Sequence, residues 1–570
     1  MLKETLLRYK WYALGSFLMV IAVVASTLLQ PHYLQDVLTA VLKNDQQTIK
    51  DFGSMLVIIA LVGLIAGAVN TVLAAKIAQG VSADIREATF RKIQSFSYAN
   101  IEDFNAGNLV VRMTNDITQI QNLMMMVFQV LLRVPILFVG AFIMAIQTLP
   151  KLWWVIILMV LVIALIMGLV MSQMGPRFGQ FQSLMDRINQ IAKENLRGVR
   201  VVKSFVQERQ QYEKFKETSN QLLGLNLFIG YGFSIMQPAL SLVSYLAIYV
   251  SILLVSGMVK TEPTVVGSIA SFMTYMMQIM FSIIMVGFMG MQASRAFISI
   301  GRIKEILNTQ PAMTFTSTDV EDLNGDLVFD HVSFTYPNED KPMLKDISFE
   351  IAAGQMVGVV GATGAGKSTL AQLIPRLFDP QEGQITIGGK DLKSLSQATL
   401  RQTVAIVLQK AILFSGTIAD NLRQGNAHAD HYTMRAAARI AQASEFIDRM
   451  EQGYDSHVEE RGNNFSGGQK QRMSIARGVI GQPKILVLDD STSALDAKSE
   501  KLVQEALNKD LKGTTTIIIA QKISSVVKAD KILVLDDGQL IAQGTHSDLV
   551  ANNAVYREIY ETQKGKEEED

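Results

Sequence analysis

The stretch Gly361-Ala362-Thr363-Gly364-Ala365-Gly366-Lys367-Ser368-Thr369 decides the fold of the C-terminal half of the chain. An apolar run over residues 355–360 precedes it, and a helix-like run over residues 370–374 follows it. Between a strand and a helix, glycines let the backbone curl so that its N–H groups face a triphosphate. In this pattern Lys367 reaches the β- and γ-phosphates, and the hydroxyl of Ser368 binds Mg²⁺. The sequence therefore predicts a nucleoside triphosphate site rather than a glycine-rich turn with an ordinary surface lysine.

A second motif, Ile485-Leu486-Val487-Leu488-Asp489-Asp490, follows in the same half. A buried apolar strand that ends in a carboxylate places Asp489 beside the phosphates, where it can hold Mg²⁺ through water. Strand-like runs alternate with helical patterns around both motifs, which predicts a mainly parallel sheet covered on both faces. The expected strands are residues 327–336, 355–360, 384–387, 404–408, 485–488, 515–520 and 531–535, and the expected helices are residues 368–378, 433–450, 468–480 and 498–511.

The composition of the 570 residues excludes several classes of protein. Lys+Arg and Asp+Glu balance at 52 each, so the bulk charge gives no reason to expect a nucleic-acid partner. The chain has no cysteine, which excludes disulfides, thiolate chemistry and cysteine-ligated zinc. Hydrophobic residues make up 49% of the chain and the mean hydropathy is +0.24, which is high for a soluble protein.

Long apolar runs are confined to the N-terminal half. A helix needs about 20 apolar residues to cross the hydrocarbon core of a bilayer. The third run is shorter, and we expect Arg133 at its edge to snorkel and extend it. Residues 1–10 are expected to lie at the membrane interface before an uncleaved first span. The six predicted spans are residues 11–29, 55–75, 134–147, 152–171, 239–258 and 269–291.

Two long connections between these spans are basic and have helical patterns. Residues 76–112 contain five Lys and Arg residues, and residues 177–216 contain nine. The positive-inside rule places both connections, and both termini, in the cytoplasm. We expect each connection to consist of helices that run beyond the bilayer, with turning points near residues 97–107 and 206–215.

The composition changes along the chain and predicts its domain boundaries. We expect a transmembrane domain over residues 1–304, a linker over residues 305–324 and a nucleotide-binding domain over residues 325–570. The linker is polar and broken by Pro311. The last residues, 564–570, are charged, and we expect them to form a disordered tail.

The stretch Asn464-Phe465-Ser466-Gly467-Gly468-Gln469-Lys470-Gln471-Arg472 resembles the signature sequence of ATP-binding cassette (ABC) transporters, with Phe465 where leucine is usual. Ser466 and nearby backbone N–H groups open a helix whose positive end can face a γ-phosphate. The resemblance covers nearly the whole chain, and six spans followed by one cassette is the layout of a half-size type IV exporter. It implies an α-helical membrane domain of six transmembrane helices with long cytoplasmic extensions. It also implies an α/β P-loop ATPase domain with a helical subdomain, and coupling helices at the two turning points.

The resemblance assigns roles to particular residues. Tyr336 matches the aromatic residue that stacks on adenine, Gln409 matches the glutamine that contacts Mg²⁺ and the attacking water, and residues 493–496 match the D-loop. Cassettes of this family close head to tail, so Ser466, Gly467, Gly468 and Gln469 are expected to complete a partner's ATP site. The implied Mg²⁺ ligands are Ser368, Gln409 and Asp489, and the implied ATP-binding residues are Tyr336, Gly361, Thr363, Gly364, Ala365, Gly366, Lys367, Ser368, Thr369 and Gln409.

Two catalytic positions depart from the family pattern. Asp490 stands where a glutamate normally polarises the attacking water, and its carboxylate is retracted by roughly 1.5 Å, a misplacement that can cost about a hundredfold in rate. Gln521 stands where the family has a histidine, and an amide can only hydrogen-bond, whereas histidine can also carry a proton. Together the two changes predict a site that binds ATP and hydrolyses it slowly. A homodimer would contain two impaired sites, so a heterodimer with a second half-transporter, as in bacterial heterodimeric multidrug exporters, is favoured.

The last two predicted spans are rich in methionine and phenylalanine and contain few ionisable residues. Methionine can repack around dissimilar apolar ligands, although contacts with lipid and between helices also use it. We therefore expect a lipophilic cargo, with drugs as the first choice, a lipid or lipid-linked molecule as the second and a processed peptide as the third. The expected location is the plasma membrane of a bacterium. The alternatives from other classes are an ATP-gated channel or regulator and a soluble nucleic-acid-associated ATPase, the second of which conflicts with six spans.

Overall fold

The structure is a computed structural model that describes residues 2–256, 265–315, 317–337 and 339–567. The chain forms two compact units. The first contains residues 1–94 and 107–309, and the second contains residues 95–106 and 310–570. The chain therefore enters the second unit twice, once for a short segment and once for the remainder of its length.

Long helices build the first unit. Six helical stretches among the described residues are long and apolar enough to cross a membrane, namely Lys10–Leu42, Gln46–Gln94, Ala106–Thr148, Pro150–Arg197, Glu208–Ser256 and Val265–Asn308. Each predicted span lies within one of them, except that residues 257 and 258, at the end of the fifth, lie outside the described residues. The elements are α1 (Leu2–Arg8), α2 (Lys10–Leu42), α3 (Gln46–Gln94), α5 (Ala106–Val111), α6 (Ile117–Met126), α7 (Arg133–Thr148), α8 (Trp153–Arg197), α9 (Val199–Ser204), α10 (Glu208–Ser256) and α11 (Val265–Asn308), with π-helical turns η1 (Arg112–Asp116) and η2 (Val127–Leu131) and a 3₁₀ turn η3 (Pro150–Leu152).

The helices extend well beyond the predicted spans. The third predicted span is the last part of a continuous helical stretch that begins at Ala106, so it needs no extension by Arg133. The first turning point is as predicted, because helix α4 (Tyr98–Phe104) lies within residues 97–107. The second turning point was predicted too late, because the turn consists of α9 and the residues on either side of it and shares only residues 206 and 207 with the predicted range 206–215. The N–H of Gly198 makes the last i→i−4 hydrogen bond of α8, to Glu194 O at 2.8 Å, and Val206 adopts a left-handed φ of +52° before α10 begins.

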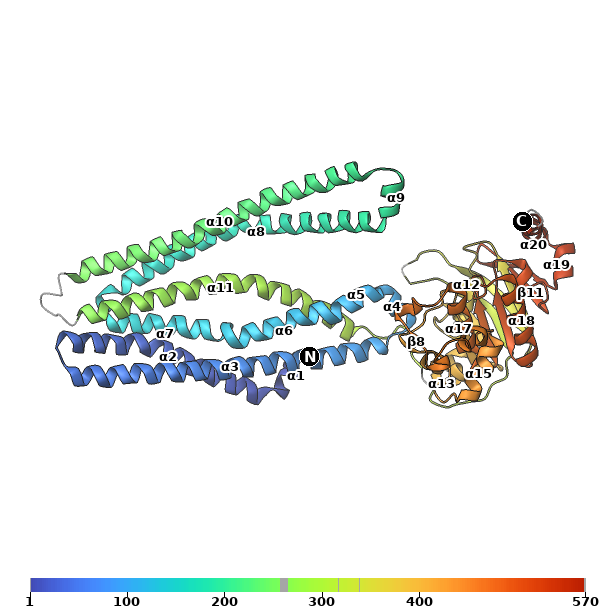
Figure 1. Ribbon diagram of the computed structural model, residues 1–570, viewed down its shortest axis with the longest axis horizontal. Helices are drawn as coiled ribbons and strands as arrows, with labels where there is room; N and C mark the ends of the chain where they lie inside the picture. The colour runs from blue at the N-terminus through green and yellow to red at the C-terminus, as the bar shows by residue number, and fades with distance from the viewer. Residues whose placement is uncertain (1, 257–264, 316, 338, 568–570) are drawn as a thin grey trace. The chain divides into compact units, whose positions relative to one another are not determined.

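Helices α8 and α10 pack against each other along their length and are joined by α9 (Figure 1). Toward α9 this pair departs from the other helices of the first unit (Figure 1). The end of the pair carries exposed apolar side chains, of which Leu196, Phe205 and Val206 are 76%, 70% and 78% exposed. A gathering of apolar side chains of this kind is typical of a surface that contacts another molecule.

The largest apolar cluster of the first unit lies where α7, α8, α10 and α11 meet. Phe272, Met276 and Met280 of α11 are buried in it. Phe281, the next residue along α11, and Met285 are instead 54% and 49% exposed. The methionine-rich helix therefore uses some of its flexible side chains for packing within the protomer and presents others on its surface.

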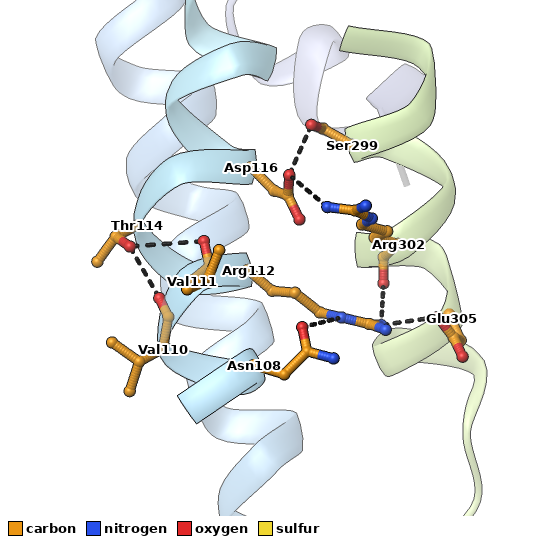
Figure 2. Close-up of polar contacts among 9 residues, drawn as sticks. All are labelled: Asn108, Val110, Val111, Arg112, Thr114, Asp116, Ser299, Arg302 and Glu305. Carbon is orange, nitrogen blue, oxygen red and sulfur yellow. Dashed lines mark hydrogen bonds and ion pairs between the residues drawn. The ribbon is translucent and has the colours of Figure 1, made fainter. Parts of the chain in front are cut away.

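A group of charged residues joins η1 to α11, and we call it the polar joint (Figure 2). Arg112 Nη1 donates to Glu305 Oε2 at 2.7 Å and to the backbone oxygen of Arg302 at 3.1 Å. Asp116 Oδ1 accepts from Ser299 Oγ at 2.7 Å and lies 3.7 Å from Arg302 Nη1. The side chains of Arg112 and Asp116 are only 10% and 3% exposed. Because a buried charge is costly unless it is paired, these contacts fix η1 against α11.

The second unit is built on two sheets. A six-stranded sheet has the order β12-β11-β3-β10-β9-β6 and is parallel except for the pairing of β12 with β11. A four-stranded antiparallel sheet has the order β2-β1-β4-β5. The strands are β1 (Leu327–Phe334), β2 (Leu344–Ile351), β3 (Met356–Gly361), β4 (Glu382–Ile387), β5 (Lys390–Asp391), β6 (Val404–Val407), β9 (Ile485–Asp489), β10 (Thr515–Ile519), β11 (Lys531–Asp536) and β12 (Gln539–Gly544), and a small hairpin pairs β7 (Gly416–Thr417) with β8 (His457–Val458).

Alternate residues of the central strands face two different apolar clusters. Leu486 and Leu488 of β9 belong to one cluster, and Ile485 and Val487 belong to the other. The sheet is therefore covered on both faces, which explains why its strands read as unbroken apolar runs in the sequence. The helices are α12 (Lys367–Leu373), α13 (Gln397–Thr403), α14 (Ile418–Arg423), α15 (His431–Ile440), α16 (Ser444–Ile447), α17 (Gly467–Val479), α18 (Ala497–Asp510), α19 (His546–Asn552) and α20 (Ala554–Glu567).

Helix α4 belongs to the second unit although it lies between two stretches of the first. The ring of Tyr98 packs edge-on against Phe378 at a centroid distance of 5.5 Å, and Ala99 is part of an apolar cluster of the sheet. Asn100 Nδ2 donates to the backbone oxygen of Gln310 at 3.4 Å, and its Oδ1 accepts from the N–H of Ala312 at 2.9 Å. The segment is therefore held by both apolar and polar contacts.

Several expected elements differ in the structure. Strands β2 and β12 were not predicted. The predicted helix over residues 433–450 divides into α15 and α16, because Gln442 between them has a left-handed φ of +55°. The expectation of a disordered tail over residues 564–570 was wrong as far as Glu567, where α20 ends, and residues 568–570 lie outside the described residues.

The polar joint generates a test of stability. Glu305→Met leaves Arg112 largely buried without its carboxylate, and we expect a loss of about 1–2 kcal/mol, less than for a fully buried pair because Glu305 is half exposed. The double variant Arg112→Met/Glu305→Met removes the buried charge as well and should recover at least half of that loss. Thermal unfolding of the full chain in detergent measures both variants. A double variant that unfolds at a lower temperature than Glu305→Met alone would contradict this role of the ion pair.

Candidate nucleotide site

A cavity of about 350 Å³ lies at the carboxyl ends of β3, β9 and β10. Two larger hollows, of about 670 and 660 Å³, lie elsewhere on the second unit, but neither is lined by the phosphate-binding turn. The chemistry of the lining, rather than the volume, therefore assigns the site. The lining residues are Tyr336, Met343, Thr363, Gly364, Gly366, Lys367, Ser368, Thr369, Gln409, Asp489, Asp490, Ile519 and Gln521.

The turn between β3 and α12 requires glycine for steric reasons. Gly364 and Gly366 have left-handed φ values of +87° and +94°. A Cβ atom on Gly361 would lie 2.1 Å from the backbone oxygen of Leu535 in the neighbouring strand. Lys367, the first residue of α12, lies over this turn and donates from Nζ to the backbone oxygens of Gly361 and Ala362 at 2.8 and 2.7 Å. The turn is thus curled back beneath its own ammonium group, which is where a triphosphate would be cradled.

The residues expected to hold Mg²⁺ come together at this cavity. Ser368 Oγ donates to Asp489 Oδ1 at 3.0 Å, which links the first turn of α12 to the end of β9. Burial raises the pKa of the Asp489 carboxyl, opposed by the hydrogen bond from Ser368 and by the charge of Lys367. A hydroxyl and a carboxylate, with the amide of Gln409 on the same lining, form the oxygen donor set that Mg²⁺ accepts together with phosphate oxygens. These residues fit the ion, which would neutralise phosphate charge when bound.

Asp490 follows Asp489 and sits in a turn with a left-handed φ of +45°. Its Oδ2 accepts from Gln409 Nε2 at 2.9 Å, and its own backbone N–H donates to the backbone oxygen of Ile519 at 2.9 Å. Burial raises the pKa of the Asp490 carboxyl, and the hydrogen bond from Gln409, the charge of Lys367 and the nearby backbone of Gln521 oppose the rise. Asp490 is therefore held through both its side chain and its backbone.

Tyr336 also lies where the sequence led us to expect it. Its hydroxyl is 3.0 Å from Thr369 Oγ1 and 3.1 Å from Gln372 Oε1, both on α12. Its ring packs edge-on against Phe334 and Phe378 at 5.0 and 5.3 Å. Burial raises the pKa of the hydroxyl. One edge of the ring is therefore fixed by the protein while the residue still lines the cavity.

The signature residues do not line this cavity. Ser466 caps α17, because its Oγ accepts from the Gln469 N–H at 3.3 Å and its own N–H donates to Gln469 Oε1 at 2.9 Å. Gln471 Oε1 accepts from the Ala494 N–H at 2.9 Å, which connects this helix to the D-loop. Phe465 is 5% exposed and packs against Phe446, so the replacement of the usual leucine fills a core position.

Of the ATP-binding residues expected from the sequence, only Gly361 and Ala365 are absent from the lining. Sequence reasoning missed Met343 and Ile519, which line the cavity, and Glu500, whose Oε1 accepts from Thr492 Oγ1 and Ser525 Oγ. A lone methionine before a strand and a glutamate within a helix carry no signal for such roles. Among the described residues, no group of three or more His, Cys, Asp or Glu side chains forms another metal site.

Two parts of the chain each match a known protein family. Residues 13–283 match the family described as ABC transporter transmembrane region, and residues 344–493 match the family described as ABC transporter. The chain is 35% identical to an uncharacterized ABC transporter ATP-binding protein, YfiB, of Bacillus subtilis, over 97% of this chain and 96% of that protein. It is 34% identical to an ATP-dependent lipid A-core flippase of Pseudomonas syringae, over 85% and 81% of the two chains.

The fold is also similar to a solved structure, a bacterial Atm1-family ABC exporter with ATP bound. The TM-score is 0.79 at 26% identity, and the match covers 97% of this chain and 98% of the other. Six helices able to span a membrane, one ATPase unit and similarity along the whole length agree with each other. The chain belongs to the ABC transporter family and is a multi-pass half-transporter of the exporter type.

Proposed function

We propose that this chain is the subunit of a heterodimeric exporter that binds ATP firmly and hydrolyses it slowly at its own site. The observation that carries the proposal is the position of Asp490. Its carboxylate accepts a hydrogen bond from Gln409 Nε2, and its side chain is one methylene shorter than the glutamate of the family pattern. A carboxylate held back in this way is displaced from the water that it should polarise, and a displacement of about 1 Å can cost about a hundredfold.

Gln521 strengthens this interpretation. Gln521 lines the same cavity as Asp490. An amide side chain cannot take up and release a proton near neutral pH as histidine can. The parts that bind triphosphate and Mg²⁺ are complete, so the losses fall on turnover and not on nucleotide binding.

The signature supports a partner with a complete catalytic site. Ser466 to Gln469 form an ordered helix cap, and none of them lines the chain's own cavity. In a head-to-tail dimer they would complete the partner's ATP site, where a catalytic glutamate and histidine would be supplied by the partner. Two copies of this chain would combine two slow sites, which favours a different second half-transporter.

The helical unit supports dimerisation. The pair formed by α8 and α10 ends in exposed apolar residues around α9, including Leu196, Phe205 and Val206. We place this end in the cytoplasm, together with both termini and the ATPase unit, where it would dock on a partner's ATPase unit. Covering these side chains would stabilise the dimer by about 25 cal/mol for each Å² of apolar surface removed from water.

The cargo that we favour is lipophilic. Phe281 and Met285 of α11 are about half exposed, and such flexible or flat side chains suit dissimilar apolar molecules. Drugs are our first candidate class. A lipid is the second, favoured by the similarity to the lipid A-core flippase of Pseudomonas syringae. The protein would export this cargo from the cytoplasm across the plasma membrane of a bacterium.

The slow site can be tested by restoring the family residues. The purified chain alone should hydrolyse ATP slowly, and Asp490→Glu/Gln521→His should raise kcat by at least tenfold, because the longer carboxylate reaches the attacking water. Lys367→Ala in the restored background is the matched control and should remove the gain. Steady-state phosphate release from full-length protein in nanodiscs measures all three. Turnover of the unmodified chain at the rate of the restored variant would overturn the slow-site proposal.

A transport assay separates the cargo classes. Inside-out vesicles that contain this chain and its partner should accumulate a lipophilic dye when given ATP, with inhibition by vanadate. In reconstituted liposomes, ATP-dependent movement of a fluorescent phospholipid without dye accumulation would replace drugs by lipids as the cargo class. Passive ion conductance without accumulation of either probe would contradict export and favour a gated channel.

A further inference from the structure

The side chain of Gln563, on helix α20, contacts the turn that follows β10. Its Nε2 donates to the backbone oxygen of Gln521 at 2.8 Å, and its Oε1 accepts from the backbone N–H of Ile523 at 2.7 Å. Both contacts are made to the turn that follows β10. Because a carbonyl oxygen needs a donor and an N–H group needs an acceptor, the orientation of the Gln563 amide is fixed by chemistry.

The helix that carries Gln563 is firmly seated on the second unit. Tyr556 is fully buried in the apolar cluster on one face of the sheet, and its hydroxyl lies 2.8 Å from His546 Nδ1. The ring of Tyr560 packs against His546 at a centroid distance of 5.0 Å. Arg557 donates from Nε to the backbone oxygen of Val550. The anchor lies on the same helix, one and two turns before Gln563, so it limits how far the amide can move.

The turn is also held by α18. Glu500 Oε1 accepts from Ser525 Oγ and from Thr492 Oγ1, and Gln504 Nε2 donates to the backbone oxygen of Ser525 at 3.1 Å. The contacts of α18 meet the end of the turn, at Ser525. The contacts of Gln563 meet its beginning, at Gln521, two residues after Ile519, whose backbone oxygen accepts from the Asp490 N–H. The two helices therefore hold different parts of one turn.

We propose that Gln563 is a positioning residue of the ATP site, which fixes the turn after β10 and thereby the position of Asp490. Gln563 holds the Gln521 carbonyl, and two residues earlier the Ile519 carbonyl accepts from the Asp490 N–H at 2.9 Å. Gln521 and Asp490 line the same cavity, whereas Gln563 does not line it. The inference rests on the proposed ATP site but not on its slow turnover.

The chemistry of the amide allows its two contacts to be separated. In Gln563→Glu the carboxylate still accepts from the Ile523 N–H, but it cannot donate to the Gln521 oxygen and repels it. In Gln563→Ala both contacts are lost. Thr562→Ala, at the exposed neighbouring position of α20, is the matched control.

Amide hydrogen exchange of the full-length chain in nanodiscs tests the contacts directly. Gln563→Ala should speed exchange at Ile523 about three- to tenfold, which is the range expected for the loss of one hydrogen bond. Gln563→Glu and Thr562→Ala should leave this amide as protected as in the unmodified chain. Unchanged exchange in Gln563→Ala, or equal acceleration in Thr562→Ala, would contradict the contacts of Gln563 with this turn.

The rate at which a fluorescent ATP analogue dissociates in the presence of Mg²⁺ tests the consequence for the site. Both Gln563 variants should release the analogue at least twofold faster, and Thr562→Ala should release it at the unmodified rate. Faster exchange at Ile523 in Gln563→Ala without faster release would overturn the positioning role. If the unmodified chain bound no analogue, the proposed ATP site would be contradicted. The exchange measurement would still decide whether Gln563 holds the turn.

Discussion

The parallel pairing of β10 between β3 and β9 is the constraint on which the nucleotide site depends. Ile519 lies opposite Val359 on one side and Asp489 on the other. Because parallel strands end at the same edge of a sheet, this register brings the glycine-rich turn, the paired carboxylates and Gln521 to one place. A slip of one residue would turn the side chain of Asp489 to the opposite face of the sheet. The many apolar residues of these strands therefore act on function by fixing register.

Much of this site could be predicted because its chemistry is local in sequence. The turn over residues 361–369 contains its own geometry, since glycines stand where φ is positive and the lysine and serine follow directly. The strand that ends in Asp489 is similarly self-contained. The family, the six spans and the ATPase fold could be predicted for the same reason, because each is indicated by runs of adjacent residues. All three predictions were confirmed.

The features that were missed depend on contacts between distant residues. Gln563 lies 42 positions after Gln521, and nothing near it in the sequence indicates that the two residues are in contact. Arg112 and Glu305 are separated by 193 positions, and each alone reads as a surface charge on a helix. The second turning point was predicted too late because α8 ends directly before Gly198. A single glycine in a segment rich in Lys and Arg gave no clear signal for a helix end. Strand β12 alternates between exposed and half-buried residues and has no fully buried one, so it gave little signal.

The membership of α4 in the second unit has a consequence for the chain as a polymer. The backbone crosses from one unit to the other three times, near residues 94, 106 and 309, and not once as in a simple tandem protein. The ATPase unit is therefore not a contiguous gene segment. A fragment that began at Gln310 would lack Tyr98 and Asn100, and would leave Phe378 uncovered on one side and the Ala312 N–H without its acceptor. Evolutionary exchange of this ATPase unit between transporters must carry the short helical insert with it or replace those contacts.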